Sequence, residues 1–260
     1  MRKVMMIVLA AVVLIVLWLA FCGFQWSWGP FSGLHDLKTR SLPGNASLYA
    51  PEHVETLQES PLKGKHILYL GSSVTFGAAA RGISFADYIT RHNGSVMTKE
   101  AVSGTTLVDS GPDSYVARLK RLDPGLSPDL VVCQLSTNDA TQRKPLGGIS
   151  ETGAFDTRTV AGAIEFIIQY VQKTWHCPIV FYTNPRYDSD AYRKMVDLLL
   201  QIAEKWDVPV IDLWNDAAFN AVSEEKRALW MADPIHPTQA GYLEWWTPYM
   251  ETTLYRIAGE

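Results

Sequence analysis

The 260-residue sequence has few cysteines, little net charge and no metal-binding motif, and each shortage argues against a class of protein. Cys22, Cys133 and Cys177 cannot all pair, so a disulfide framework does not hold this chain together. A net charge of −4 gives no electrostatic basis for binding nucleic acid. There is no H-E-x-x-H sequence, no Cys/His cluster and no phosphate-binding glycine motif, so we expect no metal and no cofactor.

A long uncharged run stands near the N-terminus. The residues from Val4 to Phe21 carry no charge, and Arg2 and Lys3 precede them. As a helix the run would be about 27 Å long, enough to cross the hydrocarbon core of a bilayer. Because basic residues stay on the cytoplasmic side, we predict a single-pass protein of the cell membrane whose remaining chain is extracytoplasmic.

A cleaved signal peptide is the competing interpretation of this run. Its apolar region is usually shorter, and no A-x-A-like cleavage site follows here. The segment from Leu19 to Cys22 resembles a lipoprotein box, but the bulky Phe21 departs from that pattern. We therefore predict an uncleaved membrane anchor over residues 1–22, with cleavage or lipidation at Cys22 left open.

Residues 23–64 are typical of a tether, since Gly29-Pro30 and Pro43-Gly44 interrupt them and no hydrophobic period is sustained. Two short sequences, starting at Asn45 and Asn93, match the N-x-S pattern of glycosylation acceptors.

From residue 65 to the C-terminus, short apolar runs alternate with segments of helical period, which predicts one α/β domain. The predicted strands cover residues 67–71, 95–102, 130–135, 179–183 and 208–213. The predicted helices cover residues 85–92, 115–122, 155–175, 191–206 and 239–257. Continuous apolar strands between helices indicate a parallel sheet covered on both faces, and sites in such sheets lie outside the carboxyl ends of the strands.

The first strand ends in Gly71-Ser72-Ser73, at the position expected for a site. Glycine permits a tight reversal, and a serine on that turn would project above the sheet near free backbone N–H groups. Small polar residues are also ordinary turn chemistry, so this segment alone does not choose between a turn and a nucleophile, or between the two serines.

A serine nucleophile needs a base, and His236 is the histidine best placed to be one. It lies in Asp233-Pro234-Ile235-His236-Pro237, where each proline biases the residue before it away from the helical region. The resulting extended turn would bring a carboxylate and an imidazole together, so that Asp233 could hold one ring nitrogen and leave the other free.

Two further strand ends carry possible oxyanion donors. Gly104 follows the predicted strand at 95–102, and a residue without a side chain lets a backbone N–H approach a ligand closely. Asn138 follows the strand at 130–135, and its amide could donate to an oxyanion. Either residue alone is also a common loop residue.

Taken together, the order Gly-x-Ser, Ser-Gly, Thr-Asn-Asp and Asp-x-x-His resembles the SGNH (GDSL-like) hydrolase family from about residue 65 to the C-terminus. The resemblance implies a three-layer α/β/α sandwich with a flavodoxin-like five-stranded parallel sheet, and ester hydrolysis without a metal. It implies Ser73, Asp233 and His236 as the catalytic triad, and Ser73, Gly104 and Asn138 as the oxyanion hole.

The sequence departs from the family at Ser72, which stands where the family usually has aspartate. This leaves Ser72 as a rival nucleophile. The common α/β-hydrolase alternative fits less well, because its elbow requires Gly-x-Ser-x-Gly and Thr75 occupies the last place.

These features predict a serine esterase that hydrolyses acyl or acetyl esters on the extracytoplasmic side of the membrane. Two alternatives remain open: an O-acyltransferase that uses the same triad on a cell-envelope glycan, and a tethered binding module without activity. The expected partners are the membrane and an ester substrate such as an envelope glycan or lipid, and the sequence does not choose among substrates.

Overall fold

A parallel sheet of five strands forms the centre of the domain. The computed structural model describes residues 2–26, 29–31 and 33–259. The strands are β1 (His66–Gly71), β2 (Val96–Ala101), β3 (Leu130–Gln134), β4 (Ile179–Tyr182) and β5 (Val210–Ile211). They lie in the order β2-β1-β3-β4-β5 and every pairing is parallel, which confirms the predicted sheet.

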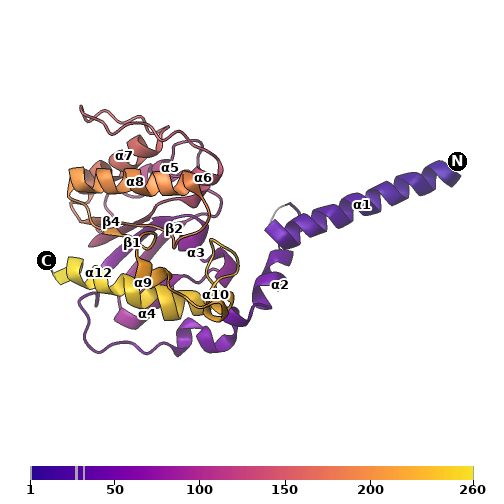
Figure 1. Cartoon of the computed structure of the whole chain (residues 1–260), viewed down its shortest axis with the longest axis horizontal. Coiled ribbons are helices and arrows are strands. Elements are labelled where there is room, and N and C mark those ends of the chain that lie inside the picture. The colour runs from indigo at the N-terminus through magenta and orange to yellow at the C-terminus, as the bar shows by residue number, and fades with distance from the viewer. Residues whose placement is uncertain (1, 27–28, 32, 260) are drawn as a thin grey trace.

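Helices cover both faces of the sheet, because successive side chains of the buried strands point to opposite sides. Leu68, Leu70 and Val131 pack beneath helices α5 (Tyr115–Arg121), α7 (Val160–Thr174) and α8 (Asp190–Trp206). Ile67, Tyr69 and Val132 pack on the other side, against α4 (Phe85–Asn93) and α12 (Thr247–Gly259). Figure 1 shows α7 and α8 above the sheet and α4 and α12 below it, the expected three-layer arrangement.

Two predicted helices and the last predicted strand differ from the structure by more than one residue. The strand predicted over 208–213 is only Val210–Ile211. The helix predicted over 155–175 begins only at Val160, because Thr159 caps it by accepting from the Gly162 N–H. The last predicted helix is divided into α11 (Gln239–Gly241), a π-helical turn (Tyr242–Trp246) and α12. The π turn directs consecutive tryptophans to different partners, since Trp245 stacks on Phe219 and Trp246 on Phe85.

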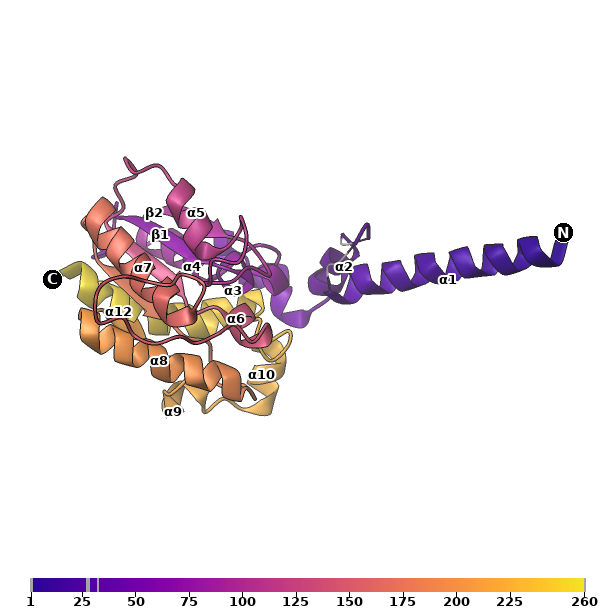
Figure 2. The same ribbon diagram turned by 90° about the horizontal axis from the view of Figure 1, so that it is seen from above.

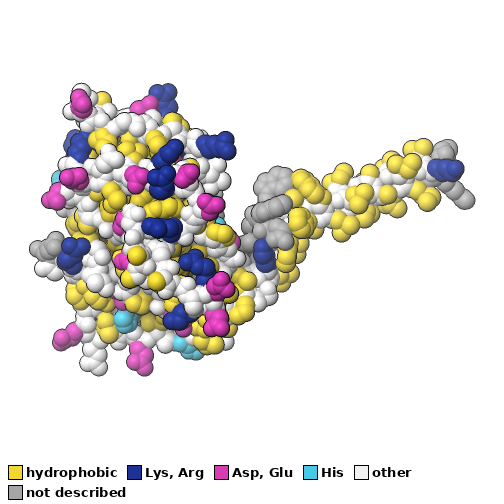
Figure 3. Space-filling model, in the orientation of Figure 1, with side chains coloured by type: hydrophobic (Ala, Val, Ile, Leu, Met, Phe, Trp, Pro, Cys, Tyr) yellow, Lys and Arg dark blue, Asp and Glu magenta, His cyan; other side chains and the backbone are white. Residues whose placement is uncertain are grey.

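The N-terminal helix α1 (Arg2–Trp26) stands apart from the domain (Figure 1). Within its stretch Lys3–Phe24, an 18-residue window has a mean hydropathy of 3.1 and is not buried, whereas Cys22 near the end of the stretch is 2% exposed. Apolar side chains cover the visible face of this helix in Figure 3. A helix of this length and composition could be a signal sequence or a single membrane anchor.

The segment between α1 and the sheet is docked on the domain over much of its length. Helix α2 (Leu34–Arg40) is followed by three short 3-10 helices: Pro43–Asn45, Ser47–Tyr49 and Pro51–His53. Tyr88 donates from its hydroxyl to the Tyr49 carbonyl at 2.6 Å, which fixes the middle of the segment to α4.

The two possible glycosylation acceptors are both inside the folded domain. Asn45 is 3% exposed and its amide donates to the Thr39 and Ala79 carbonyls. Asn93 is fully buried and its amide donates to the Ile89 carbonyl. Neither amide nitrogen is available to a modifying enzyme in the folded chain.

Candidate active site

The turn after β1 presents one serine at the carboxyl edge of the sheet. A Cβ added to Gly71 would lie 1.7 Å from Thr75 Oγ1, so the close packing of this turn requires glycine. Ser73 begins the short helix α3 (Ser73–Phe76). Its N–H belongs to the first turn of the helix, where backbone donors have no acceptor within the helix.

Ser73, His236 and Asp233 form a continuous chain of hydrogen bonds. Ser73 Oγ lies 2.7 Å from His236 Nε2. His236 Nδ1 lies 2.8 Å from Asp233 Oδ2. The structure therefore brings the three predicted triad residues together in one hydrogen-bonded chain, with the imidazole between the hydroxyl and the carboxylate.

The Asp233 carboxylate is held by its own turn. Its Oδ1 atom accepts from the Ile235 N–H at 2.8 Å and from the His236 N–H at 2.9 Å. Burial opposes its ionisation, but the hydrogen bonds from the His236 ring and from these backbone groups outweigh burial and lower the pKa of Asp233 below its usual range. The carboxylate is thus kept in the charged form that orients an imidazole.

Asn184, which no sequence motif marks, supports the turn of Asp233 and His236 from the end of β4. Its side chain is fully buried and its amide donates to the Ile235 carbonyl at 3.0 Å. Its position directly after the predicted strand at 179–183 is the one sequence signal that could have identified it.

Gly104 lies near the turn that carries Ser73. Since Ala101 pairs with Gly71 across β2 and β1, Gly104 and Ser73 follow neighbouring strands at the same edge. Gly104 has φ +81°, and a Cβ added to it would meet nothing within 4 Å. Its backbone is therefore open to an approaching ligand.

Asn138 comes from helix α6 (Thr137–Thr141), which follows β3. Its Nδ2 atom donates to the Thr105 carbonyl at 3.0 Å and to Ser72 Oγ at 3.2 Å. These contacts hold the Asn138 amide against the turn of Ser72 and Ser73, and the Asn138 side chain is only partly buried. An oxyanion bound here would compete with Ser72 for one amide hydrogen.

Ser72 hydrogen-bonds to Gln134 and Asn138, whereas Ser73 is the serine that contacts the imidazole. Ser72 is fully buried, and its hydroxyl lies 3.3 Å from Gln134 Oε1 and within hydrogen-bond distance of the Asn138 amide. The structure therefore joins Ser73 to His236 and places Ser72 in the support of the turn.

Asp139, beside Asn138, also supports the edge of the sheet. Its fully buried carboxylate accepts from the Leu107 N–H at 2.7 Å and the Val108 N–H at 3.1 Å. Asp139 thereby braces the loop that carries Leu107 and Val108. Burial raises the pKa of Asp139, and those hydrogen bonds oppose the rise.

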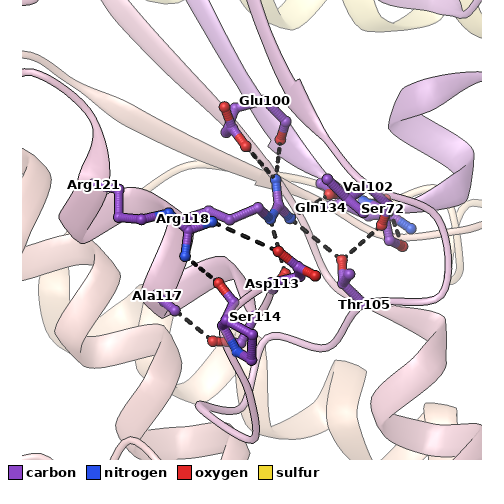
Figure 4. A network of polar contacts seen from close by, with 12 residues as sticks. Ser72, Glu100, Val102, Thr105, Asp113, Ser114, Ala117, Arg118, Arg121 and Gln134 are labelled. Carbon is purple, nitrogen blue, oxygen red and sulfur yellow. Dashed lines mark hydrogen bonds and ion pairs between the residues drawn. The ribbon is translucent and has the colours of Figure 1, made fainter.

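A buried arginine, Arg118 of α5, ties together the strand ends around the site (Figure 4). It is 2% exposed, and its guanidinium donates at 2.7 Å to the carbonyls of both Gly71 and Glu100. A longer contact of 3.4 Å reaches Thr105 Oγ1, next to Gly104. No sequence motif marks this residue, although its spacing from Tyr115 places it on the apolar face of its helix.

Two cavities open near these residues. One of about 540 Å³ lies beside Asp233 and is lined by α10 (Glu224–Trp230) and by Arg186, Tyr187 and Asp188. Another of about 350 Å³ lies beside Asp139, and Arg143 and Lys194 line it. The first adjoins the turn that carries Asp233, and the second adjoins helix α6, which carries Asn138.

A five-stranded parallel sheet with serine, histidine and aspartate joined at its carboxyl edge defines a hydrolase-like α/β protein. The sequence agrees with this class: residues 69–243 match the model of the GDSL-like Lipase/Acylhydrolase family, and the chain belongs to that family. A comparison with curated proteins finds no match.

Solved structures share the fold at low identity. A protein from Lactobacillus plantarum superimposes with a TM-score of 0.63 at 20% identity, over 74% of this chain and 97% of its own. An acetyl xylan esterase gives a TM-score of 0.54 at 15% identity, over 73% and 99% of the two chains. A variant of an acetyl-xylooligosaccharide esterase from Geobacillus gives 0.52 at 19% identity, over 78% and 97%.

Proposed function

We propose that this protein is a serine esterase that cleaves carboxylic esters through an acyl-enzyme on Ser73. The observation that carries the proposal is the hydrogen-bond chain from Ser73 Oγ through the His236 ring to Asp233. Membership of the GDSL-like lipase and acylhydrolase family supports ester hydrolysis as the reaction.

In the first half of the reaction, Ser73 Oγ attacks the ester carbonyl carbon while His236 Nε2 accepts its proton. The tetrahedral intermediate then collapses, the bond to the leaving alcohol breaks, and His236 returns the proton to that alcohol. Asp233 keeps the ring oriented and stabilises the imidazolium, which its ionised state allows.

In the second half, a water molecule gives its proton to His236 and attacks the acyl carbon. Ser73 Oγ leaves with the proton returned from the imidazolium, and the free acid departs. A sugar hydroxyl in place of that water would make the reaction an acyl transfer, with the same acyl-enzyme and the same residues.

Three donors would stabilise the oxyanion in both halves. They are the N–H of Ser73 at the start of α3, the N–H of Gly104 in its open loop, and the Asn138 amide. The Asn138 amide would release Ser72 and donate to the developing negative charge. Removing one donor of this kind typically lowers turnover by about 100- to 1000-fold.

We further propose that α1 is an uncleaved anchor and that the catalytic domain lies on the extracytoplasmic side. Arg2 and Lys3 ahead of the apolar run support this orientation. We also propose that the acyl group is short. The similarity in fold to an acetyl xylan esterase and to an acetyl-xylooligosaccharide esterase supports this.

Hydrolysis of p-nitrophenyl acetate by the detergent-solubilised full chain tests the proposal. We expect Ser73→Ala to reduce turnover to background and Ser72→Ala to retain measurable turnover. The reverse pattern would assign the nucleophile to Ser72. A wild-type rate no higher than that of Ser73→Ala, across esters of increasing acyl length, would favour a tethered binding module.

A further inference from the structure

The proposed site and helix α1 lie on the same side of the domain. Figures 1 and 2, which are views at right angles, both place α3, α6 and α10 at the end of the domain nearest α1. The C-terminal end of α12 lies at the opposite end in both views.

Asn45 fixes this orientation with three hydrogen bonds. Its amide donates at 2.7 Å to the carbonyls of Thr39, in α2, and Ala79, just after the nucleophile helix. Its Oδ1 atom accepts at 2.9 Å from the N–H of Gln239, three residues after His236. Because α1 packs on α2, the bonds of Asn45 connect the apolar helix to both halves of the proposed triad.

Three apolar side chains on this side of the domain are exposed. Phe76 is 41% exposed and lies three residues after Ser73 in α3. Val102 is 39% exposed and directly follows β2, and Leu37 of α2 is 59% exposed. Single exposed apolar residues are common on protein surfaces, but these three lie on segments at the edge that carries the site.

Two arginines lie beside them. Arg40 ends α2, and Arg81 follows the 3-10 helix Ala78–Ala80 against which α2 packs. Both arginines are exposed, and neither side chain has a hydrogen bond or ion pair within the described part of the chain. Basic residues beside exposed apolar ones are typical of surfaces that lie on anionic bilayers.

We propose that this rim, made of Leu37, Phe76, Val102, Arg40 and Arg81, rests on the bilayer that holds α1. The apolar side chains reach below the headgroups and the arginines pair with anionic lipids. The site then opens toward the membrane surface and receives esters carried in or along it. The inference rests on the proposed anchoring of α1, and it does not depend on which ester is cleaved.

The two ends of β2 provide a matched pair of reporter positions. Val96 begins the strand and is 54% exposed, whereas Val102 follows its end, so the same residue type stands at opposite edges of the sheet. The strand separates them by about 20 Å. The full chain carrying Val96→Cys, Val102→Cys or Phe76→Cys is labelled with bimane and reconstituted into vesicles of phosphatidylcholine and phosphatidylglycerol. The unsubstituted chain measures labelling of the native cysteines.

Quenching by brominated phosphatidylcholine reports lipid contact, and flotation of the vesicles after an alkaline wash reports anchoring. We expect labels at 102 and 76 to lose most of their fluorescence and the label at 96 to keep it. Equal quenching at 96 and 102 in chains that float would overturn the rim contact alone. Chains that do not float would overturn both the anchor and the rim contact. Ester hydrolysis is measured separately, and a chain that hydrolyses no ester can still show lipid contact and anchoring.

Discussion

Ser73 Oγ lies 2.7 Å from His236 Nε2, although 163 positions separate the two residues in the chain. Parallel strands make this contact possible, because they bring the turn after β1 and the turn before α11 to one edge of the sheet. The contact involves the second serine of the pair, while the first hydrogen-bonds to the Asn138 amide.

Replacing Asn138 should affect turnover more than replacing Ser72. Asn138→Ala removes a proposed oxyanion donor, and we expect kcat to fall about 100- to 1000-fold. Ser72→Ala removes neutral hydrogen bonds to the Asn138 amide and to Gln134, so we expect a loss of about 10-fold. Steady-state kinetics with p-nitrophenyl acetate compares the two variants, and a larger loss for Ser72→Ala would show that Asn138 is not a principal donor.

Gly104→Ala tests the second proposed donor against a control with the same backbone. Gly104 has φ +81° and Gly153 has φ +78°, and an added Cβ meets nothing within 4 Å at either position. Each alanine should therefore destabilise the fold by a similar amount, about 1 to 2 kcal/mol. Only Gly104→Ala should also lower kcat, by about 100-fold, because strain there moves the proposed donor.

If Gly153→Ala lowers kcat as much as Gly104→Ala does, the effect is general strain and Gly104 is not a donor. Thermal unfolding of both variants shows whether their losses of stability match.

Asp233→Asn should abolish most activity and change the pH dependence of stability. We expect kcat to fall by up to about 10⁴-fold at neutral pH, as in other serine triads whose aspartate is replaced by asparagine. Asp188→Asn is the control, because Asp188 is exposed and lines the same cavity as Asp233. This variant should leave kcat within a few-fold of wild type.

The pKa of Asp233 is lowered in the folded chain. Its ionised form therefore stabilises the fold fully above the unfolded pKa of about 3.9, and this contribution is lost as the pH falls through the lower folded value. Chemical unfolding at several pH values should show that wild type and Asp233→Asn converge in stability as the pH falls below about 4. A constant difference would contradict the lowered pKa.

Arg118→Met should destabilise the domain by about 3 to 5 kcal/mol, because a buried guanidinium is removed and the carbonyls of Gly71 and Glu100 lose their donor. Arg121→Met is the matched control, since Arg121 is 54% exposed and lies in the same helix. Arg121→Met should lower the free energy of unfolding by less than about 1 kcal/mol. Similar losses in denaturant unfolding would contradict a special role for Arg118.

The strands and the long helices could be predicted because each depends on local signals, and the candidate triad because its segments stand in the order typical of a known family. Buried apolar runs mark β1 and β3, and two prolines set the turn that holds Asp233 and His236. Arg118 and Asn184 could not be predicted in the same way. Their roles depend on carbonyls contributed by distant segments, which only the packed chain brings into range.

The segment before the sheet shows the same limit. Its turn residues indicate a tether, but the structure buries Asn45 between Ala79 and Gln239, both remote in sequence. Similarly, the choice between Ser72 and Ser73 depends on which hydroxyl reaches the imidazole. The direction of two adjacent side chains on a tight turn is set by packing around Gly71 and Gln134.

Covalent trapping is the most direct test of Ser73 as the nucleophile. The full chain is treated with a fluorophosphonate, digested, and the modified peptide is sequenced by mass spectrometry. We expect one adduct, on Ser73, and we expect none in Ser73→Ala. In His236→Ala the adduct should be strongly reduced, because the proposed base that activates the hydroxyl is gone. An adduct on Ser72, or folded protein that forms no adduct on Ser73, would contradict this assignment.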